Sequence, residues 1–147
     1  MAGILTALDD VPDPVFAEAM VGPGVAVLAE DGPGLSSVTA VAPVSGTLVT
    51  VHPHAFVVLT AGGRAVLVHL GIDTVRLKGE GFTVHAEVGT HRAVGDPVVT
   101  WSPRAVAESG LSTLVPVVAL DAGPGALHVE GAIGSRVGAG QSLFVWS

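Results

Sequence analysis

Glycine and proline interrupt every part of this sequence at short intervals, and their spacing limits the chain to short elements of secondary structure. The 147 residues include 20 glycines and 10 prolines, and the runs between them are apolar and rich in valine. Glycine and proline end helices and form tight turns, whereas valine favours strands. The sequence therefore predicts an all-β fold of many short strands, either a sandwich or a barrel.

The apolar runs between the turns mark the expected strands, and two other segments mark short helices. We expect strands at residues 24–29, 46–51, 54–60, 65–70, 97–101, 116–120 and 142–146. A short helix should follow the favoured N-cap Ser102, with Pro103 in its first turn and Gly110 past its end. A second helical turn is expected within residues 13–20. Both helices should lie at the periphery of the β structure.

A weak internal repeat runs through the second half of the chain. The shift that aligns Trp101 with Trp146 also aligns Val88 with Ile133, Gly89 with Gly134 and Gly95 with Gly140. Each copy reads as an apolar residue, two spaced glycines and a strand that ends in tryptophan. The pattern predicts two similar hairpin-like units within one sandwich. The alternative is a chance match within a sequence rich in glycine and valine.

Composition and charge narrow the class of protein further. Because 49% of the residues are hydrophobic and only 13% are charged, the chain can bury a core, and its length suits a single domain over residues 1–147. The net charge of -7 disfavours nucleic acids and anionic lipids as partners. The sequence has no apolar run of membrane-spanning length, no signal-peptide layout and no cysteine. We expect a cytoplasmic protein without disulfides or thiolate chemistry.

Three of the six histidines lie in the segment VHPHAFVVLTAGGRAVLVHLGID. Its two glycines stand between alternating apolar runs, which is typical of a hairpin with a two-residue turn. This turn predicts a register that pairs Phe56 with His69, His54 with Gly71 and His52 with Asp73. All of these side chains would share one face, with His54 and His69 as diagonal neighbours and Gly71 leaving space beside them. A loop of odd length would instead place the two histidines on opposite faces.

Two imidazoles that face each other indicate two kinds of chemistry. A neutral imidazole is nucleophilic near neutral pH, so one histidine could carry a phosphoryl group while the other stabilises it. The alternative is a zinc hydrolase, whose ligands would be His52, His54, His69 and Asp73.

For the remaining candidate residues in and around this segment, the sequence predicts less specific roles. Phe56 would surface beside the histidines as a docking contact for a partner protein. Asp73 could cap a turn, orient a histidine or meet a positively charged partner. The other histidines are expected to be solvated bystanders, namely His85, His91 and His128.

Several motifs resemble one known family over nearly the whole chain. The segments VHLGID and HAF, together with PDPVFAEAMVGPG, APVSGTLV, VGDPV and STLVPVV, are similar to the glucose-type enzyme IIA domain of the bacterial phosphoenolpyruvate-dependent sugar phosphotransferase system. The resemblance implies an antiparallel β-sandwich of the barrel-sandwich type, also described as a duplicated hybrid motif, with one or two short peripheral helices.

By this resemblance, His69 is the phosphoacceptor and reacts through Nε2. It would take a phosphoryl group from the phosphorylated histidine phosphocarrier protein and pass it to the IIB domain of a glucose-family sugar permease. His54 would hydrogen-bond the phosphoryl oxygens, and Asp73 would belong to the docking face. Regulatory protein targets are compatible with this role. No cofactor is expected, although paired imidazoles such as His54 and His69 can collect adventitious or regulatory zinc.

The sequence departs from the family pattern at two places. His52 stands where many relatives have a threonine that assists by hydrogen bonding, and an imidazole there would add a titrating group. The chain also starts close to the first family strand, so an edge strand is expected to be short or missing. A biotin- or lipoate-carrying domain is a further alternative, but the sole lysine, Lys78, does not stand in a hairpin-tip motif.

Overall fold

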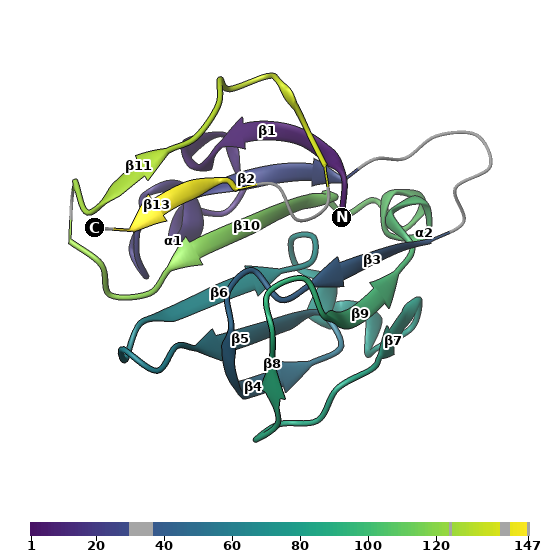
Figure 1. Ribbon diagram of the computed structural model, residues 1–147. Coiled ribbons are helices and arrows are strands. Elements are labelled where there is room, and N and C mark those ends of the chain that lie inside the picture. The colour runs from purple at the N-terminus through teal and green to yellow at the C-terminus, as the bar shows by residue number, and fades with distance from the viewer. Residues whose placement is uncertain (30–36, 124, 139–141, 147) are drawn as a thin grey trace.

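The computed structural model describes residues 1–29, 37–123, 125–138 and 142–146 (Figure 1). The strands are β1 (Gly3–Ala7), β2 (Gly24–Ala29), β3 (Val38–Val41), β4 (Gly46–His52), β5 (Ala55–Leu59), β6 (Ala65–His69), β7 (Phe82–Val84), β8 (His91–Arg92), β9 (Pro97–Trp101), β10 (Leu114–Ala119), β11 (Leu127–Val129), β12 (Arg136–Val137) and β13 (Phe144–Trp146). Within the described ranges, the largest sheet has eight strands in the order β12-β1-β2-β10-β6-β5-β4-β8. A second sheet has the order β3-β9-β7, and β11 pairs with β13. All strand pairs are antiparallel.

The predicted strands are all present, and their ends differ from the expected ones by at most two residues. The helical elements are η1 (Leu8–Asp10), α1 (Pro14–Ala17), η2 (Thr74–Leu77) and α2 (Pro103–Glu108). The Ser102 side chain accepts a hydrogen bond from the Ala105 N–H at 3.2 Å, as expected of an N-cap. Asp13 caps α1 in the same way through the Val15 N–H at 2.9 Å. Both predicted helical segments are therefore confirmed.

The internal repeat has a counterpart in the hydrogen bonds of the sheet. The Gly89 N–H donates to the Leu48 carbonyl at 2.7 Å, and the Gly134 N–H donates to the Leu5 carbonyl at 2.7 Å. Each glycine has a positive φ, 88° and 93° respectively. The two copies thus attach to β4 and β1 in equivalent ways, which supports the predicted pair of similar units. The Gly140 position of the repeat lies outside the described residues.

The predicted register of the β5–β6 hairpin is wrong by one residue. The ladder pairs Ala55 with His69, and Phe56 pairs with Val68. The Thr60 N–H donates to the Arg64 carbonyl at 2.8 Å, so the loop consists of residues 61–63. The Gly-Gly pattern was interpreted as a complete two-residue turn, whereas Ala61 also belongs to the loop. A loop of odd length reverses the face of every side chain relative to the partner strand.

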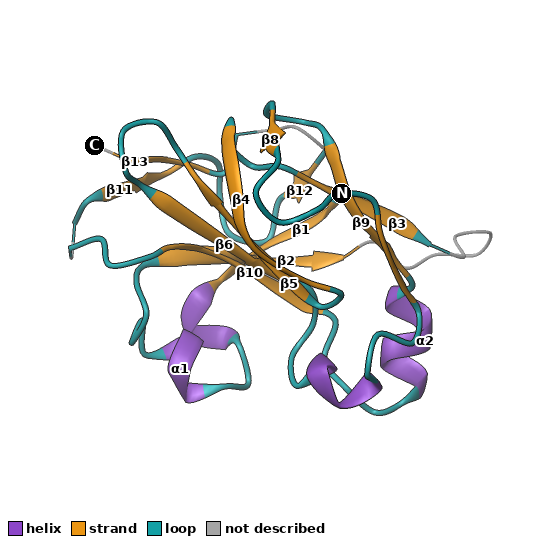
Figure 2. Ribbon diagram, turned by 90° about the horizontal axis from the view of Figure 1, so that it is seen from below, coloured by secondary structure: helices purple, strands orange, loops and turns teal. Residues whose placement is uncertain are grey.

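Strand β6 separates two apolar clusters that lie on opposite faces of the large sheet. Val68 points into the larger cluster, which contains Phe56. Leu67 packs against a second cluster, to which α1 supplies Phe16. Side chains alternate along a strand, so His69 projects from the same face as Leu67. Figure 2 shows α1 and α2 projecting from the same side of the strands.

The sequence predicts a short or missing edge strand, and the edge strands of the large sheet, β12 and β8, have two residues each, whereas β1 has five residues and lies inside the sheet. β1 pairs with β2 on one side and with β12 on the other. Among the described residues, no helix has both the length and the apolar character needed to cross a membrane.

Gly46 allows two segments of backbone to approach closely, and we expect its replacement by alanine to destabilise the fold. A Cβ at this position would lie 2.2 Å from the Leu59 carbonyl oxygen. Relief of this overlap requires a backbone shift, so Gly46→Ala should lower the free energy of unfolding by about 1–3 kcal/mol, measured by urea denaturation. Gly123→Ala is the matched control, because no such contact lies within 4 Å of its added Cβ. Equal losses in the two variants would contradict this explanation.

Candidate functional site

His52 and His69 lie in one row of side chains that crosses the large sheet. The ladders pair His52 with Ala55 and Ala55 with His69. Continuing the β10–β6 register by one step places Pro116 on the other side of His69. Residues in register share a face of the sheet, so all of these side chains project the same way. The small side chain of Ala55 leaves room between the two imidazoles.

His54 occupies this room from a turn rather than from a strand. It belongs to the two-residue turn between β4 and β5, whose flanking residues His52 and Ala55 are paired. Its carbonyl accepts a hydrogen bond from the Leu70 N–H at 2.7 Å, which ties the turn to the end of β6. The centroid of the His54 ring lies 5.3 Å from that of His69, with 71° between the ring planes. The centroid of the His54 ring lies 5.6 Å from that of the His52 ring, and these two ring planes are nearly parallel, at 19°. The three imidazoles form one continuous arc, which we call the histidine arc.

The turn after β6 fixes the ring of His69. Its Nδ1 lies 2.6 Å from the Gly71 carbonyl oxygen. A carbonyl can only accept, so Nδ1 carries the proton and Nε2 of the neutral ring keeps its lone pair. Gly71 has a φ of 78°, and a Cβ there would lie 2.6 Å from the Thr74 side chain. Thr74 is itself held by donating its hydroxyl hydrogen to the Leu70 carbonyl at 2.7 Å. The glycine and threonine of the GIDT sequence thus hold the accepting carbonyl in place.

Two residues beside His69 were not predicted as part of the site. The Phe16 ring lies 5.2 Å from the His69 ring, tilted by 56°, on the side of α1. Asp13, the N-cap of α1, is one of the charges that raise the pKa of His69. The PDPVFAEA motif was a signal for both residues. Local periodicity, however, does not reveal which strand such a short helix packs against.

Burial lowers the pKa of both His54 and His69 from the ordinary value of 6.5. For His69, the hydrogen bond to the backbone carbonyl and the charges of Asp13 and Asp73 raise the pKa but do not overcome burial. For His54, the positive charges of His69 and then His52 add to the lowering. Both rings are therefore mainly neutral at neutral pH, which is the nucleophilic state of an imidazole.

The structure contradicts the expected positions of Phe56 and Gly71. Phe56 is fully buried, with 0% of its surface exposed, and it faces the larger core on the side of the sheet opposite to His69. It therefore cannot be a docking contact. Gly71 leaves no space beside the histidines, because the Ser112 carbonyl oxygen would lie 2.9 Å from an added Cβ. The one-residue register error accounts for the prediction at Phe56.

Asp73 and His52 are both exposed, but they are not the facing pair that was expected. Asp73 precedes η2 in the left-handed conformation, with φ of 61°, and its side chain makes no capping hydrogen bond. It acts on His69 through its charge. His52 instead stacks on His54, within the histidine arc.

The alternative functions receive no support from the geometry. In the part of the chain that the structure describes, no group of three or more His, Cys, Asp or Glu side chains could hold a metal ion, so the zinc-hydrolase reading is not supported. Lys78 follows η2 rather than standing at a hairpin tip, which argues against a biotin or lipoate carrier. The three expected bystanders are exposed, namely His85, His91 and His128.

The lowered pKa of His69 makes the stability of the fold dependent on pH. Because the folded chain favours the neutral ring, the unfolded chain binds the proton more readily as pH falls through 6.5, and stability decreases. We expect His69→Gln to reduce the loss of unfolding free energy between about pH 7.5 and about pH 5.5. Urea denaturation at both pH values measures this loss. The exposed His91→Gln is the control, and an unchanged pH dependence in His69→Gln would refute the assignment.

His52 lowers the pKa of His54 through its charge, so His52→Thr should raise the pKa of His54 toward 6.5. The pKa of His69 should move less, because His52 is not among the groups that shift it. NMR titration of the ring protons measures both values in one experiment. If the pKa of His54 is the same in His52→Thr as in the unmodified chain, the stacked His52 ring does not affect the titration of His54.

Comparison with known proteins gives a consistent set of matches. The sequence model of the family described as phosphoenolpyruvate-dependent sugar phosphotransferase system, EIIA 1, matches residues 1–123. A glucose-specific EIIA component of the phosphotransferase system from Halalkalibacterium halodurans is 44% identical over 118 residues, which cover 79% of this chain and 65% of the relative. A glucose-specific EIICBA component from Streptococcus pneumoniae is also 44% identical, over 79% of this chain but 15% of that protein. The chain thus spans less than two thirds of the length of both relatives.

One solved structure is similar over almost the whole chain. The glucose permease IIA from Mycoplasma capricolum has a TM-score of 0.82 and 35% sequence identity, covering 97% of this chain and 88% of that one. This similarity confirms the predicted antiparallel β-sandwich.

Proposed function

The chain belongs to the EIIA 1 family of the phosphoenolpyruvate-dependent sugar phosphotransferase system, and from this premise we propose that it carries a phosphoryl group on His69 between two other proteins. The donor is the phosphorylated histidine phosphocarrier protein, and the acceptor is the IIB domain of a glucose-family sugar permease. The chain is thus a phosphotransferase that passes through a phosphohistidine intermediate. The proposal includes a cytoplasmic location, where phosphoenolpyruvate is produced.

The observation that carries the proposal is the hydrogen bond from His69 Nδ1 to the Gly71 carbonyl, at 2.6 Å. It leaves the lone pair of Nε2 free to attack the phosphorus atom. As the new N–P bond forms, the bond from phosphorus to the donor's histidine nitrogen breaks, and that nitrogen keeps the electron pair. The His69 ring gains positive charge during the attack. The carbonyl and the carboxylates of Asp13 and Asp73 favour that charge.

His54 supports the transferred group in this proposal. Its ring is roughly perpendicular to that of His69, at 71°, so an N–H at its edge can reach a phosphoryl oxygen bound to His69. Phosphoryl transfer depends mainly on alignment and on stabilisation of the equatorial oxygens. A neutral imidazole supplies one such hydrogen bond. His52 affects the phosphoryl group only indirectly, because its ring stacks on that of His54 rather than on that of His69.

Docking involves exposed apolar and acidic residues in or next to α1 and η2 rather than Phe56. Val15 is 42% exposed, Met20 is 68% exposed and Val75 is 60% exposed. The exposed Asp73 adds negative charge to this surface. A partner with an apolar patch and basic residues fits these features. The name of the EIICBA relative from Streptococcus pneumoniae indicates A, B and C components in one protein, which supports a IIB domain as the acceptor.

The test is phosphate transfer with residue-level mapping. Incubated with phosphoenolpyruvate and the upstream carriers, the chain should acquire one acid-labile phosphoryl group on His69. His69→Gln should abolish this product, because the nucleophile is removed. His54→Gln should still accept the group but deliver it to a IIB domain about 10²-fold more slowly, since one stabilising donor is lost.

Two outcomes would overturn the proposal or its assignments. Phosphorylation retained in His69→Gln would show that another residue is the acceptor. Equal losses of acceptance and delivery in His54→Gln would contradict the separate role of that ring. Normal stability of the variants, checked by thermal unfolding, is needed for each comparison, and His128→Gln provides an exposed histidine control.

A further inference from the structure

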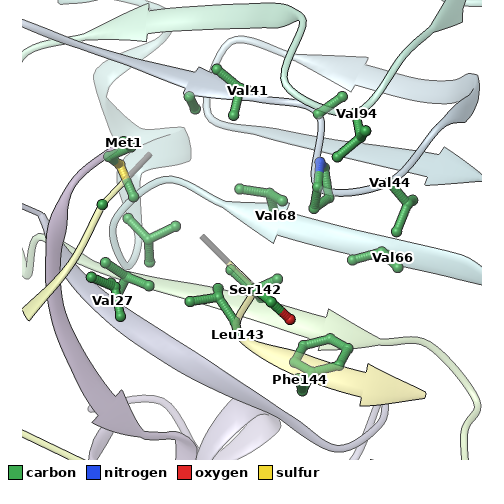
Figure 3. Close-up of a pocket in the computed structure, with 17 residues that line it drawn as sticks. Met1, Val27, Val41, Val44, Val66, Val68, Val94, Ser142, Leu143 and Phe144 are labelled. Atoms are coloured by element: carbon green, nitrogen blue, oxygen red, sulfur yellow. The ribbon is translucent and has the colours of Figure 1, made fainter. Parts of the chain in front are cut away.

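The two methionines of the chain lie in very different surroundings. The sequence contains no cysteine, so the thioethers of Met1 and Met20 are its only sulfur groups. Met1 is half-buried and packs against two of the apolar clusters of the core. It lines a valine-rich hollow together with Val27 and Val68 (Figure 3). Met20 has 68% of its surface exposed. An oxidant in solution therefore reaches Met20 more readily than Met1.

Met1 is also remote from the face of the sheet that carries the reactive histidine. Val68 and His69 are adjacent in β6, so their side chains project from opposite faces of the large sheet. The hollow beside Met1 lies on the Val68 side. Met20 follows α1, whose Phe16 lies against the ring of His69. Of the two thioethers, only that of Met20 is next to an element of the site.

The C-terminal end of α1 fixes the position of Met20. The Ala19 N–H donates to the Phe16 carbonyl at 2.9 Å, and the Met20 N–H donates to the Val15 carbonyl at 3.0 Å. Ala19 has a φ of 54°. These two hydrogen bonds and the left-handed conformation of Ala19 form a Schellman motif, in which side chains at the positions of Met20 and Val15 frequently make an apolar contact. Because Val15 is also 42% exposed, the motif presents two apolar residues at the surface.

A protein that docks at His69 also covers this apolar pair. Phe16 directly follows Val15, and its ring lies 5.2 Å from that of His69. Even a transient protein interface buries several hundred Å² on each partner, so it extends roughly 10 Å or more from its centre. Thioethers are adaptable apolar contacts at such surfaces. The chemical state of the Met20 sulfur therefore affects how tightly a partner docks.

We propose that hydrogen peroxide oxidises Met20 to the sulfoxide, and that this modification reversibly weakens the docking of the protein that donates the phosphoryl group. The inference rests on the proposed function. In the reaction, the sulfur lone pair attacks one peroxide oxygen, the S–O bond forms and the O–O bond breaks. The departing oxygen takes the proton of the transferred oxygen and leaves as water. Sulfur is oxidised by two electrons, and the peroxide is reduced by two.

The sulfoxide changes docking without changing the chemistry at His69. Oxidation replaces an apolar thioether by a polar group, and an apolar patch of the partner would bury that group without a hydrogen-bond donor. The backbone hydrogen bonds that end α1 do not involve the sulfur atom, so Phe16 and Asp13 keep their places beside His69. A loss of binding that is equal in the ground state and the transition state raises KM and leaves kcat unchanged.

The test begins with limited oxidation of the complete chain by hydrogen peroxide. Peptide mass spectrometry measures the sulfoxide fraction at each methionine, and Met20 should oxidise several-fold faster than Met1. Transfer from the phosphorylated histidine phosphocarrier protein is then measured as kcat and KM. Oxidation of Met20 should raise KM about tenfold and leave kcat unchanged. Treatment with the two methionine sulfoxide reductases, one for each epimer, should restore KM.

Met20→Leu is the matched variant, because it keeps an apolar side chain that peroxide does not oxidise, and it retains Met1. Each chain is compared with its own untreated sample, so the basal KM of the variant does not enter the comparison. Peroxide should leave the KM of Met20→Leu unchanged. NMR titration of the oxidised chain should give the same pKa for His69 as in the untreated chain, because α1 stays in place.

Four outcomes would overturn the inference while leaving the proposed function intact. These are equal oxidation rates of Met1 and Met20, an unchanged KM after complete oxidation of Met20, a peroxide-dependent rise in KM that persists in Met20→Leu, and a changed kcat or His69 pKa. An untreated chain that accepts no phosphoryl group would instead overturn the proposed function, and this inference with it.

Discussion

Strand β6 packs against an apolar cluster on each face, and the alternation of its side chains determines how the core and the His69 ring are arranged. It lies between β10 and β5 in the large sheet, so its backbone is held by ladders on both sides. Val68 is thereby directed into the main core, and His69 is directed to the face covered by α1. The pairing with Ala55 and the hydrogen bond from Nδ1 to the Gly71 carbonyl hold the ring of His69, our proposed phosphoacceptor, in position.

The environment of His69 balances two opposing requirements of the phosphoryl transfer that we propose. Burial favours the neutral ring, which is the form that can attack. The backbone carbonyl and the charges of Asp13 and Asp73 favour the positive ring that develops during attack. The ring centroids of Phe16 and His54 both lie close to that of His69, at 5.2 Å and 5.3 Å respectively. The Gly71 carbonyl thus defines the tautomer of His69, and burial determines its protonation state.

Much of the fold and part of the site followed from local patterns. Seven of the strands, the Ser102 cap of α2 and the repeat could be predicted because they depend on neighbouring residues. The meeting of His54 with His69 was also predicted, but for the wrong reason. Three loop residues place Phe56 in the core and would place a strand histidine at position 54 away from His69. The two rings still meet because position 54 is in a turn, where strand alternation does not apply.

The sequence by itself determined seven of the strands, the two short helical segments and which histidines are candidates for chemistry, because these depend on local propensity and on the chemistry of single residues. The tertiary structure decided the hairpin register, the burial of Phe56 and the contact of Phe16 with His69. Each of these depends on hydrogen bonds or packing between distant parts of the chain. A shift of one residue in register leaves the local strand propensity unchanged, but it exchanges the two faces of the strand. Only the complete set of long-range contacts therefore selects one register over the other.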